Sequence, residues 1–327
     1  MPRSTARRAL VALPVAFALS LTLGACSGDA SGDDATVRFG YIGDYNGASL
    51  LAIAEKQGLW KKAGLTAEVT TFNNGPVQIQ ALSAGDLDYG YIGPGAMWLP
   101  ASGKSKVIAI DTLTYADRVI GQPGIKSMKD LKGKRVGVPE GTSGDMVLNI
   151  ALAEAGMTTK DIDKVNMDPS TIVSAFSSGK IDGAGFFYPA IDTIKKKVPG
   201  LTEIADTKET GDSFPTAFVA GNKVPESKNS KVIKVLQQAN DWRAQHPDET
   251  ITLTARMLEV TEAQTKADAS HVQTLSTEEL ADKTRSGEVD EWLKKLGDFF
   301  VRNKQLDKNP DPADYYTGDL YTKAYDK

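Results

Sequence analysis

Strand-like and helix-like segments alternate along most of the chain, and this alternation constrains its fold more than any other feature. Between residues 37 and 113, short β-branched and aromatic segments are separated by segments with apolar residues at helical spacing. A second block of the same kind extends from residue 128 to residue 197. Because strand–helix–strand units with short turns build sheets that helices cover on both faces, the sequence predicts an α/β fold.

The two blocks predict two lobes, each a mostly parallel sheet flanked by helices. Extended segments at 113–124 and 214–221 are the candidates for the strands that cross between the lobes, and the chain from Glu226 onward is nearly all helical. We therefore expect residues 36–116 to form the first part of lobe 1, residues 117–216 to form lobe 2, and residues 217–327 to return to lobe 1 as its helical part.

The N-terminal segment has the features of a secretory signal. Three arginines within the first eight residues precede an apolar run at 9–21, and small residues follow it. The run is short for a membrane span and contains a proline. Leu23-Gly24-Ala25-Cys26 looks like a bacterial lipobox, so we expect residues 1–25 to be removed and Cys26 to carry a lipid anchor. The alternative is an ordinary cleaved signal next to an unmodified cysteine.

This interpretation places the protein on the outer face of the cell membrane, with the small, polar and acidic segment 26–35 as a flexible tether. The net charge of −4, without a basic stripe, does not predict nucleic-acid binding. The chain has one cysteine and two histidines, His246 and His271, so no zinc-type cluster can form. This composition gives little support to hydrolytic or metal-dependent chemistry. We predict no catalytic residues, no cofactor and no metal, and we expect a monomer.

Four turns indicate where a ligand would bind. They lie at 44–47, 73–76, 93–95 and 141–144, and each one ends a predicted strand and opens a helix. Ligands of open α/β sheets bind beyond the carboxyl ends of the strands, and helix N-termini there offer free N–H groups to anions. Each turn by itself is also an ordinary helix-capping sequence. The ligand interpretation therefore depends on the four turns together.

The candidate ligand-binding residues come from these turns and from nearby aromatic positions. Asn74, Thr142 and Ser143 are the candidates to hold an oxyanion, whereas Asp44 disfavours a plain anion and suits a solute that carries an amine. Aromatic rings would pack against the rest of the solute. The full set is Asp44, Tyr45, Asn46, Asn74, Gly75, Pro76, Gly93, Pro94, Thr142, Ser143, Gly144, Phe187, Tyr188 and Phe214.

Three stretches resemble a known family. Asn74-Gly75-Pro76 with Ala81–Gly90, the stretch Asp130–Val136 (DLKGKRV), and Ala175–Asp182 with Tyr188-Pro189 resemble the solute-binding proteins of ABC importers, in the nitrate/sulfonate/taurine group. That group usually has tryptophans where this chain has Ala184 and Phe187. The resemblance covers nearly all of residues 36–327.

The resemblance implies a two-lobed periplasmic-binding-protein type II fold that closes on one small polar solute, such as a sulfonate or taurine. It also implies an ABC permease in the membrane as the partner, and no turnover. Three alternatives stay open. Tyr45, Phe187 and Tyr188 could stack on a neutral heteroaromatic solute such as a pyrimidine, the chain could be a cofactor-synthesis enzyme of the same fold, or its membrane client could be a sensor.

Overall fold

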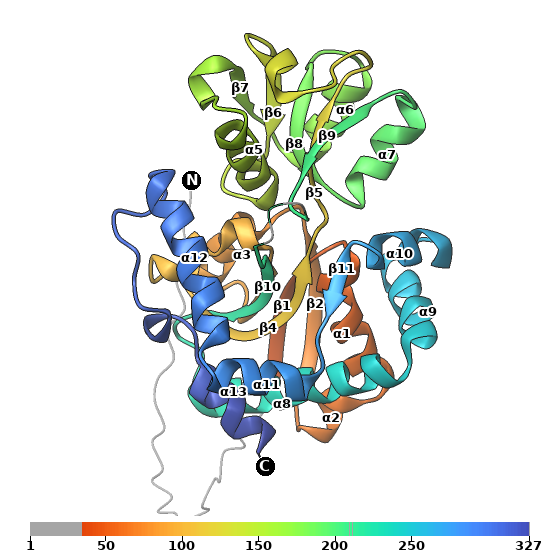
Figure 1. The fold of residues 1–327 in the computed structure, drawn as a ribbon. Coiled ribbons are helices and arrows are strands. Elements are labelled where there is room, and N and C mark those ends of the chain that lie inside the picture. The colour runs from red at the N-terminus through yellow and green to blue at the C-terminus, as the bar shows by residue number, and fades with distance from the viewer. Residues whose placement is uncertain (1–34, 209, 211, 327) are drawn as a thin grey trace, which may run out of the picture. The chain divides into compact units, whose positions relative to one another are not determined.

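The computed structural model describes residues 35–326 apart from residues 209 and 211 (Figure 1). The predicted signal peptide, the lipobox and Cys26 lie outside the described residues. Within the described part of the chain, no helix combines the length and the apolar character that a membrane crossing requires. The described residues form two sheets with helices on their faces, which confirms the predicted α/β class.

Lobe 1, the first sheet with the helices packed on it, has six strands in the order β11-β4-β10-β3-β1-β2. These strands are β1 (Thr36–Ile42), β2 (Thr66–Phe72), β3 (Tyr89–Ile92), β4 (Lys106–Thr114), β10 (Pro215–Ala220) and β11 (Val272–Thr274). Its helices are α1 (Tyr45–Lys56), α2 (Leu59–Lys62), α3 (Gly75–Ala84), α4 (Trp98–Ala101), α8 (Glu226–Gln245), α9 (Pro247–Leu258), α10 (Glu262–Ala269), α11 (Thr277–Arg285), α12 (Glu288–Arg302) and α13 (Gly318–Tyr325), with the short 3-10 turns η1 (Pro94–Ala96) and η4 (Pro312–Asp314).

Lobe 2, the second sheet with its own helices, has five strands in the order β7-β6-β8-β5-β9. These strands are β5 (Asp117–Gly121), β6 (Arg135–Val138), β7 (Asp163–Asn166), β8 (Gly183–Phe187) and β9 (Thr202–Asp206). Its helices are α5 (Ser143–Glu154), α6 (Pro169–Ser177) and α7 (Ala190–Lys197), with the 3-10 turns η2 (Met128–Leu131) and η3 (Thr159–Asp161).

Both sheets are mixed rather than mostly parallel, so this detail of the sequence prediction was wrong. β1 runs parallel to β2 and β3, but β10 runs antiparallel to β3 and β4. In lobe 2, β6 runs parallel to β7 and β8, but β5 runs antiparallel to β8 and β9. The reason is the path of the chain: β5 and β10 each enter their sheet from the junction of the lobes, against strands that end there (Figure 1).

Glycines divide two segments in which apolar residues recur at helical spacing. The segment 48–62 divides into α1 and α2 at Gly58, with φ of 63°, and the segment 279–303 divides into α11 and α12 at Gly287, with φ of 82°. Such left-handed conformations suit glycine and end a helix. The sequence prediction also lacked β9, β11 and α13, which are all short.

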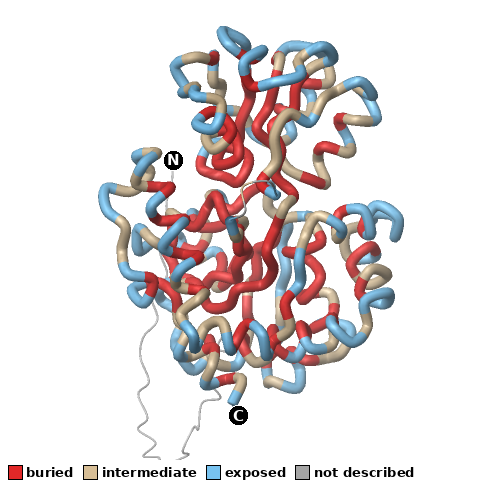
Figure 2. The backbone as a smooth tube through the Cα atoms, in the orientation of Figure 1, coloured by how far each residue is buried: buried red, intermediate tan, exposed pale blue. Residues whose placement is uncertain are grey.

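Each lobe has its own apolar core (Figure 2). In lobe 1, the buried rings of Phe39 and Tyr89 stack with their centroids 4.9 Å apart, and the ring of Phe218 meets Phe39 edge-on. Met146 and Ile150 of α5 are exceptions to this separation, because they pack with the core of lobe 1 although their helix covers the sheet of lobe 2. Helix α5 therefore joins the two lobes on one side of the junction.

Candidate ligand-binding site

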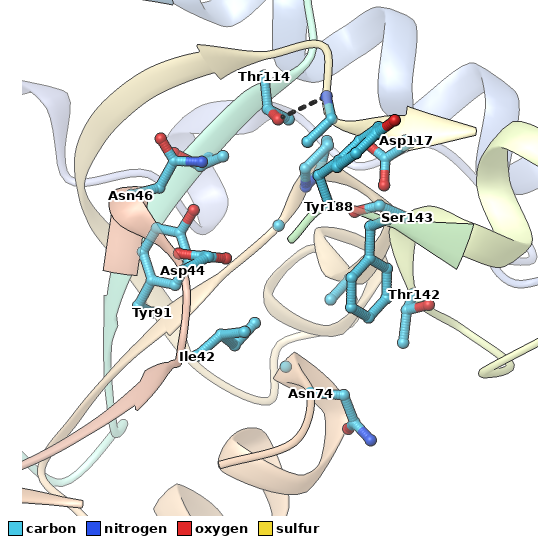
Figure 3. A pocket seen from close by; sticks show the side chains of 17 residues that line it. Ile42, Asp44, Asn46, Asn74, Tyr91, Thr114, Asp117, Thr142, Ser143 and Tyr188 are labelled. Carbon is cyan, nitrogen blue, oxygen red and sulfur yellow. Dashed lines mark hydrogen bonds between the residues drawn. The ribbon is translucent and has the colours of Figure 1, made fainter. Parts of the chain in front are cut away.

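A cavity of about 50 Å³ lies where the strand ends of the two lobes meet (Figure 3). Its wall combines the end of β1, the N-termini of α1 and α3, the turn after β3, the segment that links β4 to β5, the start of α5, the end of β8 and the start of β10. The lining residues are Ile42, Asp44, Asn46, Asn74, Gly75, Tyr91, Gly93, Pro94, Ala96, Thr114, Ala116, Asp117, Thr142, Ser143, Phe187, Tyr188 and Thr216.

Two of the three turns in lobe 1 are built by helix capping. Asp44 caps α1, since its Oδ1 accepts a hydrogen bond of 2.6 Å from the backbone N–H of Gly47. Asn74 caps α3 in the same manner, with Oδ1 accepting from Val77 N–H at 3.0 Å. Side-chain oxygens of this kind satisfy the free donors of a first helical turn. Capping fixes both polar side chains at the cavity wall before any solute is present.

The turn before α5 brings lobe 2 into direct contact with lobe 1. The Oγ atom of Ser143 accepts a hydrogen bond of 3.3 Å from the backbone N–H of Gly95, and the indole N–H of Trp98 donates to the carbonyl of Gly141 at 3.2 Å. The approach is close because Gly95 has no side chain: a Cβ there would lie 2.3 Å from backbone atoms of Thr142 and Ser143. The lobes therefore meet backbone to backbone on this side.

Most of the residues predicted from sequence come together at this cavity. They are Asp44, Asn46, Asn74, Gly75, Gly93, Pro94, Thr142, Ser143, Phe187 and Tyr188. Four others do not line it: Tyr45, Pro76, Gly144 and Phe214.

The four exceptions have structural explanations. Tyr45 is buried at the start of α1, where its backbone N–H donates to Asp268 at 2.6 Å. Pro76 belongs to the first turn of α3, and Gly144 faces β8, since a Cβ on it would lie 2.5 Å from the carbonyl oxygen of Gly185. Phe214 lines a different cavity, of about 490 Å³, between α5 and α12.

The sequence prediction missed the contribution of the crossing strands. Thr114, Ala116, Asp117 and Thr216 line the cavity, together with Ile42, Tyr91 and Ala96. A signal was present, because Thr114, Asp117 and Thr216 are polar residues inside the extended segments that were predicted to cross between the lobes. Polar residues at the points where the chain changes lobes were therefore candidates that the strand-end turns obscured.

The charge of the cavity comes from two carboxyl groups. Asp117 is 2% exposed, and its Oδ2 atom has no hydrogen-bond partner. Burial raises the pKa of Asp117 from 3.8 to about 7, although the charge of Arg118 acts in the opposite direction. Burial and the nearby carboxylate of Asp268 raise the pKa of Asp44 well above its ordinary value. No lysine, arginine or histidine is among the described residues that line the cavity.

Arg118, the chain neighbour of Asp117, does not neutralise this carboxyl group by a side-chain contact. Its guanidinium donates to Glu203 Oε2 at 2.7 Å and to the backbone carbonyl oxygens of Tyr115 and Asp117. The carboxyl of Asp117 is therefore left with only the distant attraction of its neighbour. A buried acid in that condition favours either a proton or a cationic ligand.

Hydroxyl and amide groups complete the polar wall. Asn46 accepts a hydrogen bond of 2.9 Å from Thr112 Oγ1, which lies 3.0 Å from Thr216 Oγ1. This contact uses the amide oxygen of Asn46 and leaves its amide nitrogen as the donor end. Ala116 N–H donates to Thr114 Oγ1 at 3.2 Å, which shapes the segment that links the lobes (Figure 3).

A larger cavity of about 350 Å³ adjoins the first and shares Ile42, Asp44, Phe187 and Tyr188 with it. Asp192 and Asp268 also line this outer cavity. Burial raises the pKa of Asp268 to about 7. The outer cavity is thus acidic as well, and one side of it is aromatic. In the described part of the chain, no cluster of histidine, cysteine and acidic side chains is arranged to hold a metal ion.

A family model described as NMT1/THI5 like matches residues 48–250. A protein of Brucella abortus (strain 2308), described as a binding protein, is 49% identical over 312 residues, which cover 94% of this chain and 98% of that protein. A protein of Bacillus subtilis (strain 168), described as binding aliphatic sulfonates, is 26% identical over 331 residues, covering 96% and 97%.

Solved structures share the fold. The alkanesulfonate-binding protein SsuA from Xanthomonas axonopodis pv. citri, bound to MOPS, matches with a TM-score of 0.66 and 20% identity, covering 86% of this chain and 98% of that chain. The desulfurization enzyme DSZB matches with a TM-score of 0.62 and 14% identity, covering 89% and 99%. These likenesses confirm the two-lobed fold. They also show that it serves both binding and catalysis, so the function must be argued from the site.

Proposed function

Because the chain belongs to the NMT1/THI5-like family, we propose that it is the extracytoplasmic solute-binding component of an ABC importer and that its solute carries an amine. Its relatives include proteins described as binding sulfonates and taurine, which agrees with the resemblance seen in the sequence. The observation that carries the amine is the unpartnered, buried carboxyl oxygen of Asp117 in a cavity without a lining cation.

The acidic groups of the cavity distinguish between the possible classes of solute. A plain anion such as nitrate or an alkanesulfonate would meet Asp44 and Asp117, and like charges in a desolvated site repel strongly. An ammonium group would instead form a charge-assisted hydrogen bond with Asp117. Taurine carries both an ammonium and a sulfonate. We place its ammonium at Asp117 and its sulfonate near Ser143, where the N-terminus of α5 offers free N–H groups.

The small size of the inner cavity implies that the two lobes move relative to each other when a solute binds. Sites for small organic ligands typically have volumes of roughly 300–1,000 Å³, whereas the inner cavity measures about 50 Å³. The solute therefore enters only when the lobes rotate apart, and it extends toward the outer cavity. We propose that lobe 1 comprises residues 36–116 and 217–327 and that lobe 2 comprises residues 117–216. The linking segments 115–116 and 212–214 then act as the hinge between the two lobes. Binding then shifts the equilibrium between open and closed forms.

A neutral heteroaromatic solute with an amino group, such as an aminopyrimidine, is the second candidate. Tyr91, Phe187 and Tyr188 line the inner cavity and could pack against a flat ring. Its amino group would occupy the place of the ammonium at Asp117.

We also propose that residues 1–25 are removed as a signal, that Cys26 carries a lipid and that the protein acts as a monomer with a membrane permease.

The test is a calorimetric titration of the chain lacking residues 1–25 with taurine, ethanesulfonate, ethylamine, nitrate and an aminomethylpyrimidine. Taurine and ethanesulfonate differ only in the amine, so binding of taurine alone supports the proposal. Stronger binding of ethanesulfonate than of taurine contradicts it. Recovery of the solute unchanged after incubation separates a binding protein from an enzyme of the same fold.

Binding of an amine should weaken as the pH falls below 7. The ionised form of Asp117 binds the ammonium, and its pKa of about 7 means that a proton competes below that value. A competing proton weakens binding about tenfold per pH unit below the pKa, so taurine should bind about tenfold more weakly at pH 6 than at pH 8. Calorimetry in two buffers of different ionisation enthalpy measures both the affinity and the released proton. A pH-independent affinity would remove Asp117 from the site.

A further inference from the structure

The two lobes also meet at a stacked pair of rings beside the cavity. The ring of Tyr188, just after β8 in lobe 2, stacks on the imidazole of His271 with centroids 4.0 Å apart and an angle of 21° between the planes. His271 lies between α10 and β11 of lobe 1. Tyr188 is also part of the cavity wall. One face of a proposed solute-contacting ring is therefore covered by a side chain of the opposite lobe.

The backbone of His271 is fixed to lobe 1 and to the segment that links the lobes. Its N–H donates to the carbonyl of Asp268 at 3.0 Å, and its carbonyl accepts from Tyr115 N–H at 2.8 Å. The carboxyl of Asp268 accepts from Tyr45 N–H at the start of α1. The short segment from Asp268 to His271 thus connects the turn at 44–47 with the linking segment 115–116 of the proposed hinge.

Tyr188 is fixed to lobe 2 just as firmly. Its backbone N–H donates to the carbonyl of Ala116 at 3.0 Å. Its hydroxyl donates to Glu203 Oε1 at 2.5 Å and also contacts the ammonium of Lys195. Lys195 and Arg118 each form an ion pair with Glu203 and lie over the Tyr188 ring. The ring therefore has little freedom, apart from the motion that separates it from His271.

We propose that His271 is a positioning residue for solute binding, which sets the orientation of Tyr188 at the cavity and limits the angle between the lobes. The proposal goes beyond the class of solute, but it rests on the proposed function for its effect on affinity. His271 would act through Tyr188 and would not touch the solute itself.

Burial favours a neutral His271 ring in this stack. The imidazole is faced by Arg118 of β5, by Asp192 and Lys195 of α7, and by Glu203 of β9. Burial is the largest influence and lowers the pKa of His271, and the charges of Arg118 and Lys195 act in the same direction. The carboxylates of Asp192 and Glu203 act in the opposite direction without reversing the shift. Protonation would place a cation on a ring that already carries Arg118 and Lys195 over it. The stack should therefore loosen in acid.

The chain provides a matched control. His246, the other histidine, also stacks on an aromatic ring, that of Trp242, with centroids 4.4 Å apart and an angle of 11°. It lies at the end of α8 and lines none of the cavities at the lobe junction. His246→Ala removes the same kind of stack without touching the site.

The first readout needs no solute. In a background in which Cys26 is replaced by serine, spin labels at Lys196→Cys on α7 and Lys266→Cys on α10, two exposed positions on opposite lobes, report the distance between the lobes. His271→Ala and Tyr188→Leu should each lengthen or broaden this distance, the double variant should add nothing further, and His271→Phe should preserve it. His246→Ala should match the parent. An unchanged distance in folded His271→Ala, or equal widening in His246→Ala, would overturn the proposal.

The second readout is taurine affinity by calorimetry. We expect it to fall by at least about tenfold in His271→Ala, with recovery to within about threefold of the parent in His271→Phe. If taurine does not bind the parent, the taurine assignment fails, while the distance measurement still decides the role of His271. Equal affinities in the parent and in His271→Ala would contradict the positioning role.

Discussion

Asp117→Asn is expected to stabilise the solute-free protein at pH 8 and to weaken the binding of an amine-bearing solute. The pKa of Asp117 is raised from 3.8 to about 7, so the folded protein binds a proton more tightly than the unfolded chain does. Stability from this group is complete below pH 3.8 and declines as the pH rises to 7. One pKa unit corresponds to 1.36 kcal/mol, which makes the full penalty on the order of 4 kcal/mol above pH 7.

Asparagine removes the charge but still buries a polar amide, so the net gain should be smaller, about 2 kcal/mol at pH 8, and near zero at pH 4. Affinity should change in the opposite direction. Loss of one partner of a buried charge pair costs about 2–5 kcal/mol, so taurine should bind at least about thirtyfold more weakly. Thermal unfolding at the two pH values and calorimetric titration measure the two effects.

Asp111→Asn is the matched control. Asp111 is equally buried, but its Oδ1 lies 2.8 Å from the guanidinium of buried Arg243, and it does not line the cavity. Removing it leaves Arg243 unpaired, which should destabilise the protein by about 3–5 kcal/mol and change taurine affinity much less. If Asp117→Asn instead lowers stability at pH 8, or leaves taurine binding unchanged, the unpaired carboxyl is not the amine site.

The sequence predicted the positions of cavity residues correctly where interactions between neighbouring residues determine the structure. Asp44 and Asn74 precede helices in the sequence because they cap them, and capping places them at the strand ends where ligands bind. The sequence did not predict cavity residues whose surroundings depend on segments that are distant along the chain. Asp117 is followed by Arg118, which suggests a local pair, but Arg118 turns to Glu203, which lies 85 residues away along the chain. Because of that separation, the sequence analysis did not identify the unpaired carboxyl group of Asp117 as part of the cavity.

Strand direction and aromatic placement show the same limit. Phe214 precedes β10 and was expected at the cavity, but the chain enters lobe 1 there and turns the ring toward α12. The mixed sheets follow from the same crossing, which no periodicity encodes. Gly93 and Gly95 were interpreted as exposed N–H donors for a ligand, whereas Gly95 donates to Ser143 of the opposite lobe. The small residues of this turn therefore allow a direct contact between the two lobes.

Gly95→Ala should therefore prevent the two lobes from closing on each other while each lobe still folds. Its new Cβ would lie 2.3 Å from backbone atoms of Thr142 and Ser143, and backbone cannot move aside as a side chain can. The lobes can relieve the clash by rotating apart, so the unfolding free energy should change by less than about 1 kcal/mol while taurine affinity falls more than about a hundredfold.

A graded series of glycine variants separates this effect from general damage. In Gly93→Ala the Cβ would meet only the Ser143 hydroxyl, at 2.7 Å, and this side chain can rotate, so the loss of affinity should be smaller. In Gly221→Ala, far from the junction of the lobes, the nearest atom is at 3.5 Å, and binding should stay at the parent level. Thermal unfolding and taurine titration of all three variants test the order. Parent-level taurine binding by Gly95→Ala would mean that the solute is held without the lobe contact, since a closed cleft cannot accommodate that methyl group.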